Sequence, residues 1–153
     1  MDKIIIACDS AAYNLKKRII NHLIENNIPY HDFETELGVS ALYPDVANSV
    51  AKAVAKGEYQ RGILLCGTGI GMSICANKVP GIRAAVCHDG FSAERSRKSN
   101  DAQIMCLGER VIGSELAVHL VDIWLGANFS GGGSLSKVER INELESQIHK
   151  SNT

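Results

Sequence analysis

The 153-residue sequence has no long hydrophobic run and no large excess of charge of either sign. The apolar run near the start, Ile4–Cys8, is five residues long. No run approaches the roughly 20 residues that a membrane-spanning helix needs, and the start does not have the pattern of a secretory signal. The net charge of −1 gives no basic field that would attract nucleic acid or an anionic membrane. We therefore expect a cytoplasmic protein with neither as a partner.

Paired cysteines and the usual nucleotide-binding motifs are also missing. The five cysteines are an odd number, none of them forms a C-x-x-C pair, and most lie in apolar segments. Neither a disulfide framework nor a zinc site is expected from such a pattern. In Gly67–Met72 the third glycine is misplaced for the dinucleotide fingerprint G-x-G-x-x-G, and no G-K-[ST] follows. We therefore expect no metal and no other cofactor, and a nucleotide-binding signalling domain is disfavoured.

What the sequence does have is a regular alternation of short apolar segments and segments of helical periodicity, with no internal repeat or linker. With 45% hydrophobic and 22% charged residues, it has the composition of one soluble globular domain over 1–153. Alternating strands and helices indicate an α/β, three-layer Rossmann-like fold with a five-stranded parallel sheet and an extra C-terminal helix. The strands are expected at Lys3–Cys8, Ile28–Phe33, Gly62–Leu65, Ile82–Cys87 and Gln103–Leu107, and the helices at Tyr13–Asn26, Pro44–Lys56, Gly69–Asn77, Phe91–Lys98, Gly113–Leu125 and Ser134–Lys150.

The last expected helix comes after the sheet is complete and follows three consecutive glycines, 131–133. It carries a narrow apolar stripe. Two interpretations are open: the stripe packs on its own domain, or it packs across a dimer interface. The glycine break slightly favours the dimer. The stripe consists of Leu135, Val138, Ile141, Leu144 and Ile148.

The most informative stretch is a buried-type strand that runs into Cys66 and then into a glycine-rich turn. Ligands bind at the carboxyl ends of strands in such sheets, and a helix N-terminus offers free N–H groups that stabilise a thiolate or an anionic intermediate. With the hydroxyl of Thr68 two residues on, the stretch provides a base, a proton relay and an anion hole, as proton transfer next to a carbonyl requires. The alternative is an inert core thiol beside a tight turn. Asp9, at the first strand end, is a ligand candidate or a helix N-cap.

The sequence resembles the ribose-5-phosphate isomerase B and galactose-6-phosphate isomerase family over essentially its whole length. That family interconverts aldose and ketose phosphates without a metal, through a cis-enediolate. The block from Cys66 to Arg83 is far more specific than a generic glycine loop. The matching segments are Ile6–Asp9, Tyr43–Asp45, Gly62–Gly71, Ala76–Ala84, Ser99–Asp101 and Gly108–Gly113.

The resemblance implies a role for each matching position. Cys66 would be the base that shuttles a proton between C1 and C2, and Thr68 would assist proton movement between O1 and O2. Asp9 would bind a sugar hydroxyl and help to open the ring. Asn100 and Arg110 would be contributed by the second subunit of a homodimer, or of a dimer of dimers, with shared sites. Backbone N–H groups would hold the enediolate oxygen; they belong to the segment that contains Gly67, Gly69, Ile70 and Gly71.

The sequence departs from the family pattern at ring opening and phosphate recognition. Ser10 and Ser99 stand where the family has histidines, and Gly133 and Lys137 stand where it has arginines. A lysine supplies charge but lacks the bidentate fork of arginine. His88, which follows the fourth strand, could partly replace the ring-opening histidine.

Three explanations of these departures are open. The substrate is acyclic, such as a four-carbon sugar phosphate. Alternatively, another cation, such as Arg110, Lys137 or Arg97, holds the phosphate. Or the chain is a weak isomerase or a non-catalytic sugar-phosphate-binding subunit. A hexose 6-phosphate substrate is a further possibility. The reaction expected first is that of the ribose 5-phosphate and ribulose 5-phosphate type.

Overall fold

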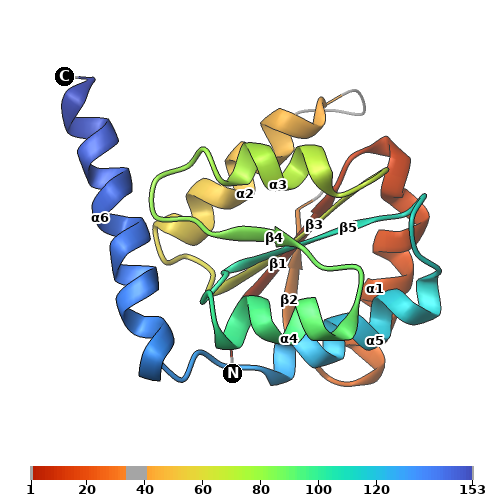
Figure 1. The fold of residues 1–153 in the computed structure, drawn as a ribbon. Helices are drawn as coiled ribbons and strands as arrows, with labels where there is room; N and C mark the ends of the chain where they lie inside the picture. The colour runs from red at the N-terminus through yellow and green to blue at the C-terminus, as the bar shows by residue number, and fades with distance from the viewer. Residues whose placement is uncertain (1, 34–40, 153) are drawn as a thin grey trace.

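A computed structural model describes residues 2–33 and 41–152. Its centre is a five-stranded parallel sheet in the order β2-β1-β3-β5-β4, with helices on both faces (Figure 1). The Rossmann-like α/β architecture expected from the sequence is confirmed. The strands are β1 Ile4–Cys8, β2 Tyr30–Asp32, β3 Arg61–Cys66, β4 Ala84–Val86 and β5 Ile104–Gly108; the helices are η1 Ser10–Ala12, α1 Tyr13–Glu25, α2 Tyr43–Ala55, α3 Ile70–Ala76, α4 Gly90–Lys98, α5 Ser114–Gly126, η2 Gly132–Ser134 and α6 Leu135–Ser151.

The central strands are buried on both faces, which is why they appear in the sequence as continuous apolar runs. Alternate residues of β1 point to opposite faces: Ile4 and Ile6 join the core beneath α1, α4 and α5, whereas Ile5 and Ala7 join the core beneath α2 and α3. Cys66 belongs to the second of these cores. The catalytic candidate therefore lies on the face that α2 and α3 cover.

The predicted boundaries differ from the structure most at the two edge strands. β2 and β4 have three residues each, where the sequence suggested six. Each has only one neighbouring strand, so fewer of its residues are fixed by ladder hydrogen bonds. The short helices η1 and η2, in which the chain turns into α1 and α6, were not predicted.

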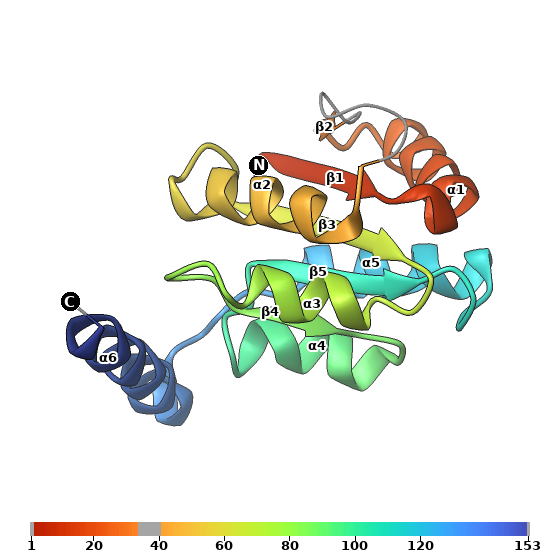
Figure 2. The same cartoon turned by 90° about the horizontal axis from the view of Figure 1, so that it is seen from above.

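The sheet has two ends, which we call the carboxyl edge and the amino edge after the ends of its strands. The chain leaves β1 for β2 on one side and returns to β3 on the other, so the crevice of a doubly wound sheet lies between the carboxyl ends of β1 and β3. Asp9 and Cys66 lie there. Figure 2 shows the strand arrows pointing away from α6, which lies beyond the amino edge.

Helix α6 has little contact with the rest of its chain. Of its apolar stripe only Val138 is buried, whereas Leu135, Ile141, Leu144 and Ile148 are between 44% and 60% exposed. Polar contacts attach it at the amino edge: Glu145 Oε2 accepts the N–H of Gly81 at 2.9 Å. Within the described residues, no helix is long and apolar enough to cross a membrane.

Candidate active site

Cys66 ends β3, and its side chain is held by the turn that follows. The residue is 5% exposed, and the backbone N–H of Gly69 donates to its Sγ at 3.1 Å. The thiol therefore has a backbone donor beside it at the open end of the strand. Burial instead raises the pKa of Cys8 to about 11, and it raises the pKa of Cys87 and Cys106 as well. Those three are therefore held as neutral core thiols.

Glycine is required at two positions, one in the turn after Cys66 and one at the end of β5. Gly69 has φ +76°, and a Cβ on it would lie 3.1 Å from the backbone of Leu107. A Cβ on Gly108, at the end of β5, would lie 2.6 Å from Thr68 Cα. The loop after Cys66 is thus pressed against the end of β5, and only glycine permits that approach.

The turn presents a hydroxyl and a free backbone donor. Thr68 is exposed, and its Oγ1 accepts the N–H of Ile70 at 3.2 Å. Within residues 2–33 and 41–152, no acceptor is recorded for the N–H of Gly71, in the first turn of α3. An anion can bind to such a group.

Tyr43, the first residue of α2, covers this turn. A Cβ on Gly71 would lie 2.5 Å from Tyr43 Cε2, so the ring rests directly on the glycine. Tyr43 was not among the predicted site residues, although the segment Tyr43–Asp45 carried part of the family resemblance. Its contact is between helices about 28 residues apart in sequence, which no local pattern reveals.

Arg110 lies beside the turn after Cys66 within the same chain. Its backbone N–H donates to the carbonyl of Gly67 at 3.1 Å, and a Cβ on Gly67 would lie 3.2 Å from its guanidinium Nη1. The resemblance assigned Arg110 to a second subunit; within one chain its side chain already lies beside the turn after Cys66, and its contact with substrate stays a prediction.

Asp9 has the N-cap role that the sequence left open. Its Oδ1 accepts the N–H of Ala11 at 2.9 Å at the start of η1, and Ser10 beside it is exposed. The cap fixes the carboxylate at the β1 end of the crevice. Contact of Asp9 or Ser10 with a sugar hydroxyl stays a prediction.

His88 has a structural partner rather than a free ring. The N–H of Gly108 donates to its Nε2 at 2.9 Å, which requires that nitrogen to be unprotonated. Burial lowers the pKa of His88, so the neutral ring is favoured. The histidine thus supports the strand end against which Thr68 lies, and its Nε2 is already used.

The other predicted ligands lie at the amino edge and do not meet Cys66 within one chain. Ser99 and Asn100 precede β5, Gly133 lies in η2, and Lys137 lies in the first turn of α6. The five-residue strand β5, roughly 15 Å long, separates the two ends. Their contribution from a second subunit stays a prediction.

Arg97, considered above as a cation for the phosphate, is not available. It is buried, and its Nη1 donates to the carbonyl of Ala102 at 2.8 Å and lies 3.1 Å from Asp101 Oδ1. The arginine that contacts the predicted ligand Ser99 is instead Arg95, whose Nε donates to Ser99 Oγ at 2.9 Å.

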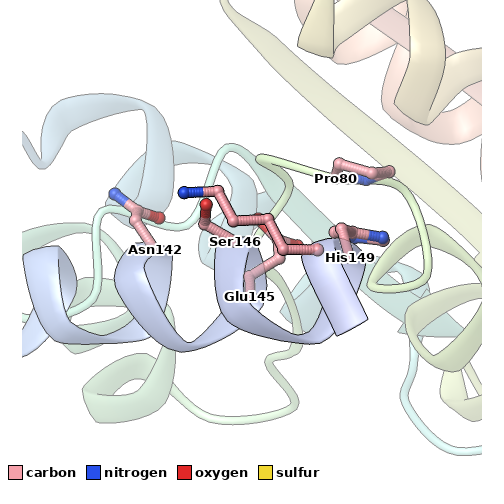
Figure 3. Close-up of a pocket in the computed structure, with 6 residues that line it drawn as sticks. Pro80, Asn142, Glu145, Ser146 and His149 are labelled. Carbon is pink, nitrogen blue, oxygen red and sulfur yellow. The ribbon is translucent and has the colours of Figure 1, made fainter. Parts of the chain in front are cut away.

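A groove of about 480 Å³ also lies at the amino edge, between α6 and the loop before β4 (Figure 3). It is far from Cys66 along the strands. Among the described residues, no three His, Cys, Asp or Glu side chains gather as a metal-ligand set. The groove is lined by Pro80, Asn142, Glu145, Ser146, His149 and Lys150.

Comparison with known proteins identifies the family of this chain. The family model described as Ribose/Galactose Isomerase matches residues 4–142. A "Ribose-5-P isomerase B" of Listeria innocua is 53% identical over 94% of this chain and 97% of its own, and a "D-erythrulose-4-phosphate isomerase" of Pectobacterium atrosepticum is 53% identical over 96% and 97%. The solved ribose-5-phosphate isomerase B of Clostridium thermocellum superposes with a TM-score of 0.90 at 50% identity, covering 95% of this chain and 99% of that one. The chain belongs to the ribose/galactose isomerase family, a family of aldose–ketose isomerases.

Proposed function

We propose that this protein interconverts the aldose and ketose forms of a small sugar phosphate through a cis-enediolate, with Cys66 as the base. The observation that carries the proposal is the N–H of Gly69 held against Cys66 Sγ at 3.1 Å, in a turn that also presents the hydroxyl of Thr68. A cysteine held in this position can act as a general base without a metal ion.

The proton transfers follow from this arrangement. The Cys66 thiolate removes the proton from C2 of the aldose and returns it to C1, so the thiolate is regenerated at the end. Meanwhile the hydroxyl of Thr68 relays a proton from O2 to O1. Negative charge on the enediolate oxygen faces the N–H of Gly71 and the Arg110 guanidinium, both of which stabilise it.

The proposed substrate class is a sugar phosphate of four or five carbons. Two relatives of equal identity carry names with different substrates, ribose 5-phosphate for one and D-erythrulose 4-phosphate for the other. A four-carbon sugar phosphorylated at O4 cannot close the usual ring, so it needs no ring-opening histidine. Ser99 in that histidine's place favours the four-carbon substrate, with ribose 5-phosphate as the second candidate.

Packing does not require glycine at position 133. A Cβ on Gly133 would meet nothing within 4 Å, and this glycine is not among those with positive φ. The fold would accept an arginine there, so its absence is consistent with a different way of holding the phosphate.

The proposed assembly is a homodimer, or a dimer of such dimers, with shared sites. Four apolar side chains of α6 are exposed on one chain, and a second chain would cover them. Such packing would also bring amino-edge residues to a partner's carboxyl edge.

The central test is exchange of the C2 proton with solvent, followed by NMR in D₂O with D-erythrulose 4-phosphate and ribose 5-phosphate. The unmodified protein should exchange the proton and isomerise at least one of them. Cys66→Ala should abolish both processes while it retains ligand affinity, and Thr68→Val should slow them by about 10²-fold. Full activity of Cys66→Ala would overturn the proposal. Binding without exchange by the unmodified protein would indicate a non-catalytic subunit.

A further inference from the structure

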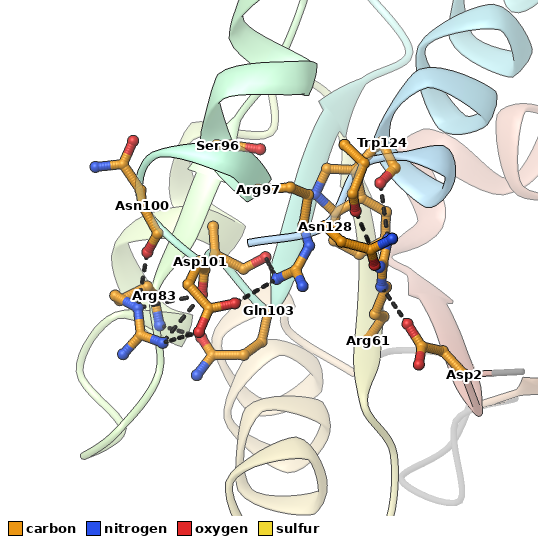
Figure 4. Close-up of polar contacts among 12 residues, drawn as sticks. Asp2, Arg61, Arg83, Ser96, Arg97, Asn100, Asp101, Gln103, Trp124 and Asn128 are labelled. Carbon is orange, nitrogen blue, oxygen red and sulfur yellow. Dashed lines mark hydrogen bonds and ion pairs between the residues drawn. The ribbon is translucent and has the colours of Figure 1, made fainter. Parts of the chain in front are cut away.

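The turn that carries Asn100 is held by an arrangement of charges at the amino edge that the proposed chemistry does not use (Figure 4). Asp101 follows Asn100 with φ +47°, a left-handed conformation that costs a non-glycine residue roughly 1 kcal/mol. The N–H of Asp101 donates to the carbonyl of Arg97, and the N–H of Ala102 donates to that of Ser96. Helices that end in this way usually have glycine at the left-handed position, which Asp101 occupies here.

What aspartate offers in place of glycine is a carboxylate between two arginines. Its Oδ2 lies 3.3 Å from Arg83 Nη2, and its Oδ1 lies 3.1 Å from Arg97 Nη1. Both arginine side chains are largely shielded from water, with 15% and 11% of their area exposed, so screening of these pairs is weak. The strained backbone is therefore compensated by contacts that fix the turn.

Arg83 also holds the backbone of the turn directly. Its Nε donates to the carbonyl of Asn100 at 2.9 Å, and its Nη2 donates to that of Asp101 at 3.0 Å. The arginine is itself fixed, since its backbone N–H donates to Gln103 Oε1 at 2.8 Å. Its remaining Nη1 donates to Asn142 Oδ1 of α6 at 3.2 Å.

The part of the turn that these contacts leave free is the side chain of Asn100. The residue is exposed, and Figure 4 shows its amide pointing away from Arg83 and Asp101. Through Arg83 and Asn142, the turn is linked to α6, whose apolar stripe is open to a second chain. The contacts thus hold an exposed amide next to the expected subunit interface.

We propose that Arg83 and Asp101 are positioning residues, which hold Asn100 in the orientation in which it binds the substrate of a second subunit. The inference rests on the proposed function, because the proposed shared-site dimer is what brings Asn100 to the substrate of the other subunit. Neither residue touches substrate. Both act by keeping the amide from rotating away with its turn, so their loss should weaken substrate binding more than the proton transfer at Cys66.

The test is a double-mutant cycle between Asp101→Asn and Asn100→Ala. Asparagine tolerates the left-handed conformation but removes the charge that pairs with the arginines. We expect Asp101→Asn to raise KM for D-erythrulose 4-phosphate about tenfold and to change kcat less than about twofold. In the Asn100→Ala background the same change should have no further effect, because the amide that it positions is gone.

Two further variants separate positioning from folding. Asp101→Gly relieves the backbone strain, so it should fold with little loss of thermal stability and still raise KM. Arg83→Lys should raise KM too, because one ammonium cannot replace a guanidinium that contacts two carbonyls and a carboxylate. The matched control is Glu115→Gln, which breaks the exposed pair with Arg18 on another face and should leave KM unchanged.

Independent effects in the cycle, or an unchanged KM in Asp101→Asn, would overturn the inference. An unchanged KM in Asn100→Ala would do the same, because the positioned group would then have no role. Repeating the cycle as Kd for D-erythrulose 4-phosphate in the Cys66→Ala background removes any dependence on turnover. A protein that binds this ligand but does not isomerise it would refute the proposed function, while the Kd cycle would still decide the positioning role.

Discussion

At the scale of single residues, the cysteines differ in their surroundings, and only Cys66 is the proposed base. Cys66 receives a backbone N–H and lies at the open edge of the sheet, whereas burial raises the pKa of Cys8 and Cys106. Thr68 and Arg110 complete the group at the same edge. Position along the strand therefore distinguishes Cys66 from the other cysteines of the chain.

The substrate range should respond to positions 99 and 133. Packing leaves Gly133 open, whereas Ser99 Oγ accepts a hydrogen bond from Arg95 Nε at 2.9 Å. Ser99→His combined with Gly133→Arg restores a ring-opening imidazole and a phosphate-binding guanidinium. We expect kcat/KM for ribose 5-phosphate, relative to that for D-erythrulose 4-phosphate, to rise about tenfold or more, since a charge-assisted hydrogen bond contributes roughly 1.5–3 kcal/mol. Steady-state kinetics with both substrates provides the measurement. An unchanged ratio would show that these positions do not set chain length.

His88 should make the stability of the protein depend on pH. Burial lowers its pKa in the folded state, so the unfolded chain binds the proton more readily. The contribution is therefore fully present above the unfolded pKa of about 6.5 and is lost as the pH falls from there toward the folded pKa. Urea unfolding between about pH 5 and 8 should show a decline for the unmodified protein that is shallower in His88→Gln. Parallel curves would contradict this assignment.

At the scale of elements, most of the fold is predictable from the sequence and the strand order is not. The buried strands β1, β3 and β5 are continuous apolar runs separated by helices, which indicates a parallel sheet. Such runs resemble one another, so nothing local reveals which strands pair. The same limit applies to the site: the turn after Cys66 was predicted, whereas Tyr43 over Gly71 is a contact between distant segments.

Helix α6 should control assembly. Ile141→Glu introduces a charge into the exposed apolar stripe, and a stripe that packs against a second chain cannot bury that charge without a large penalty. We expect the unmodified protein to sediment as a dimer and the variant to sediment as a monomer at the same concentration. Gln147→Glu, a charge on the same helix outside the stripe, is the control. Unchanged sedimentation of Ile141→Glu would exclude the stripe from the interface.

At the scale of the whole molecule, one buried arginine connects the sheet to the last part of the core. Arg61 begins β3 and is 2% exposed, and its guanidinium donates to the carbonyls of Trp124, Leu125 and Ala127 at 2.7–3.1 Å. These groups end α5. The arginine therefore satisfies carbonyls that the helix itself leaves without donors.

Replacing this arginine should destabilise the entire domain. Arg61→Met retains much of the volume but leaves several buried carbonyls without donors, so we expect the free energy of unfolding to fall by about 3 kcal/mol. Urea unfolding followed by circular dichroism measures the change. Arg140→Met, which removes an exposed partner of Glu143, should cost less than about 1 kcal/mol. Similar losses in the two variants would contradict the role assigned to burial.

The placement of Cys66 and Asn100 at opposite ends of one sheet has a genetic consequence. In the proposed symmetric dimer each chain supplies half of two sites, so two defective copies can complement each other. A mixed dimer of Cys66→Ala and Asn100→Ala chains contains one site with both defects and one with neither. Random re-association of equal amounts should therefore recover about one quarter of the unmodified activity from two impaired proteins.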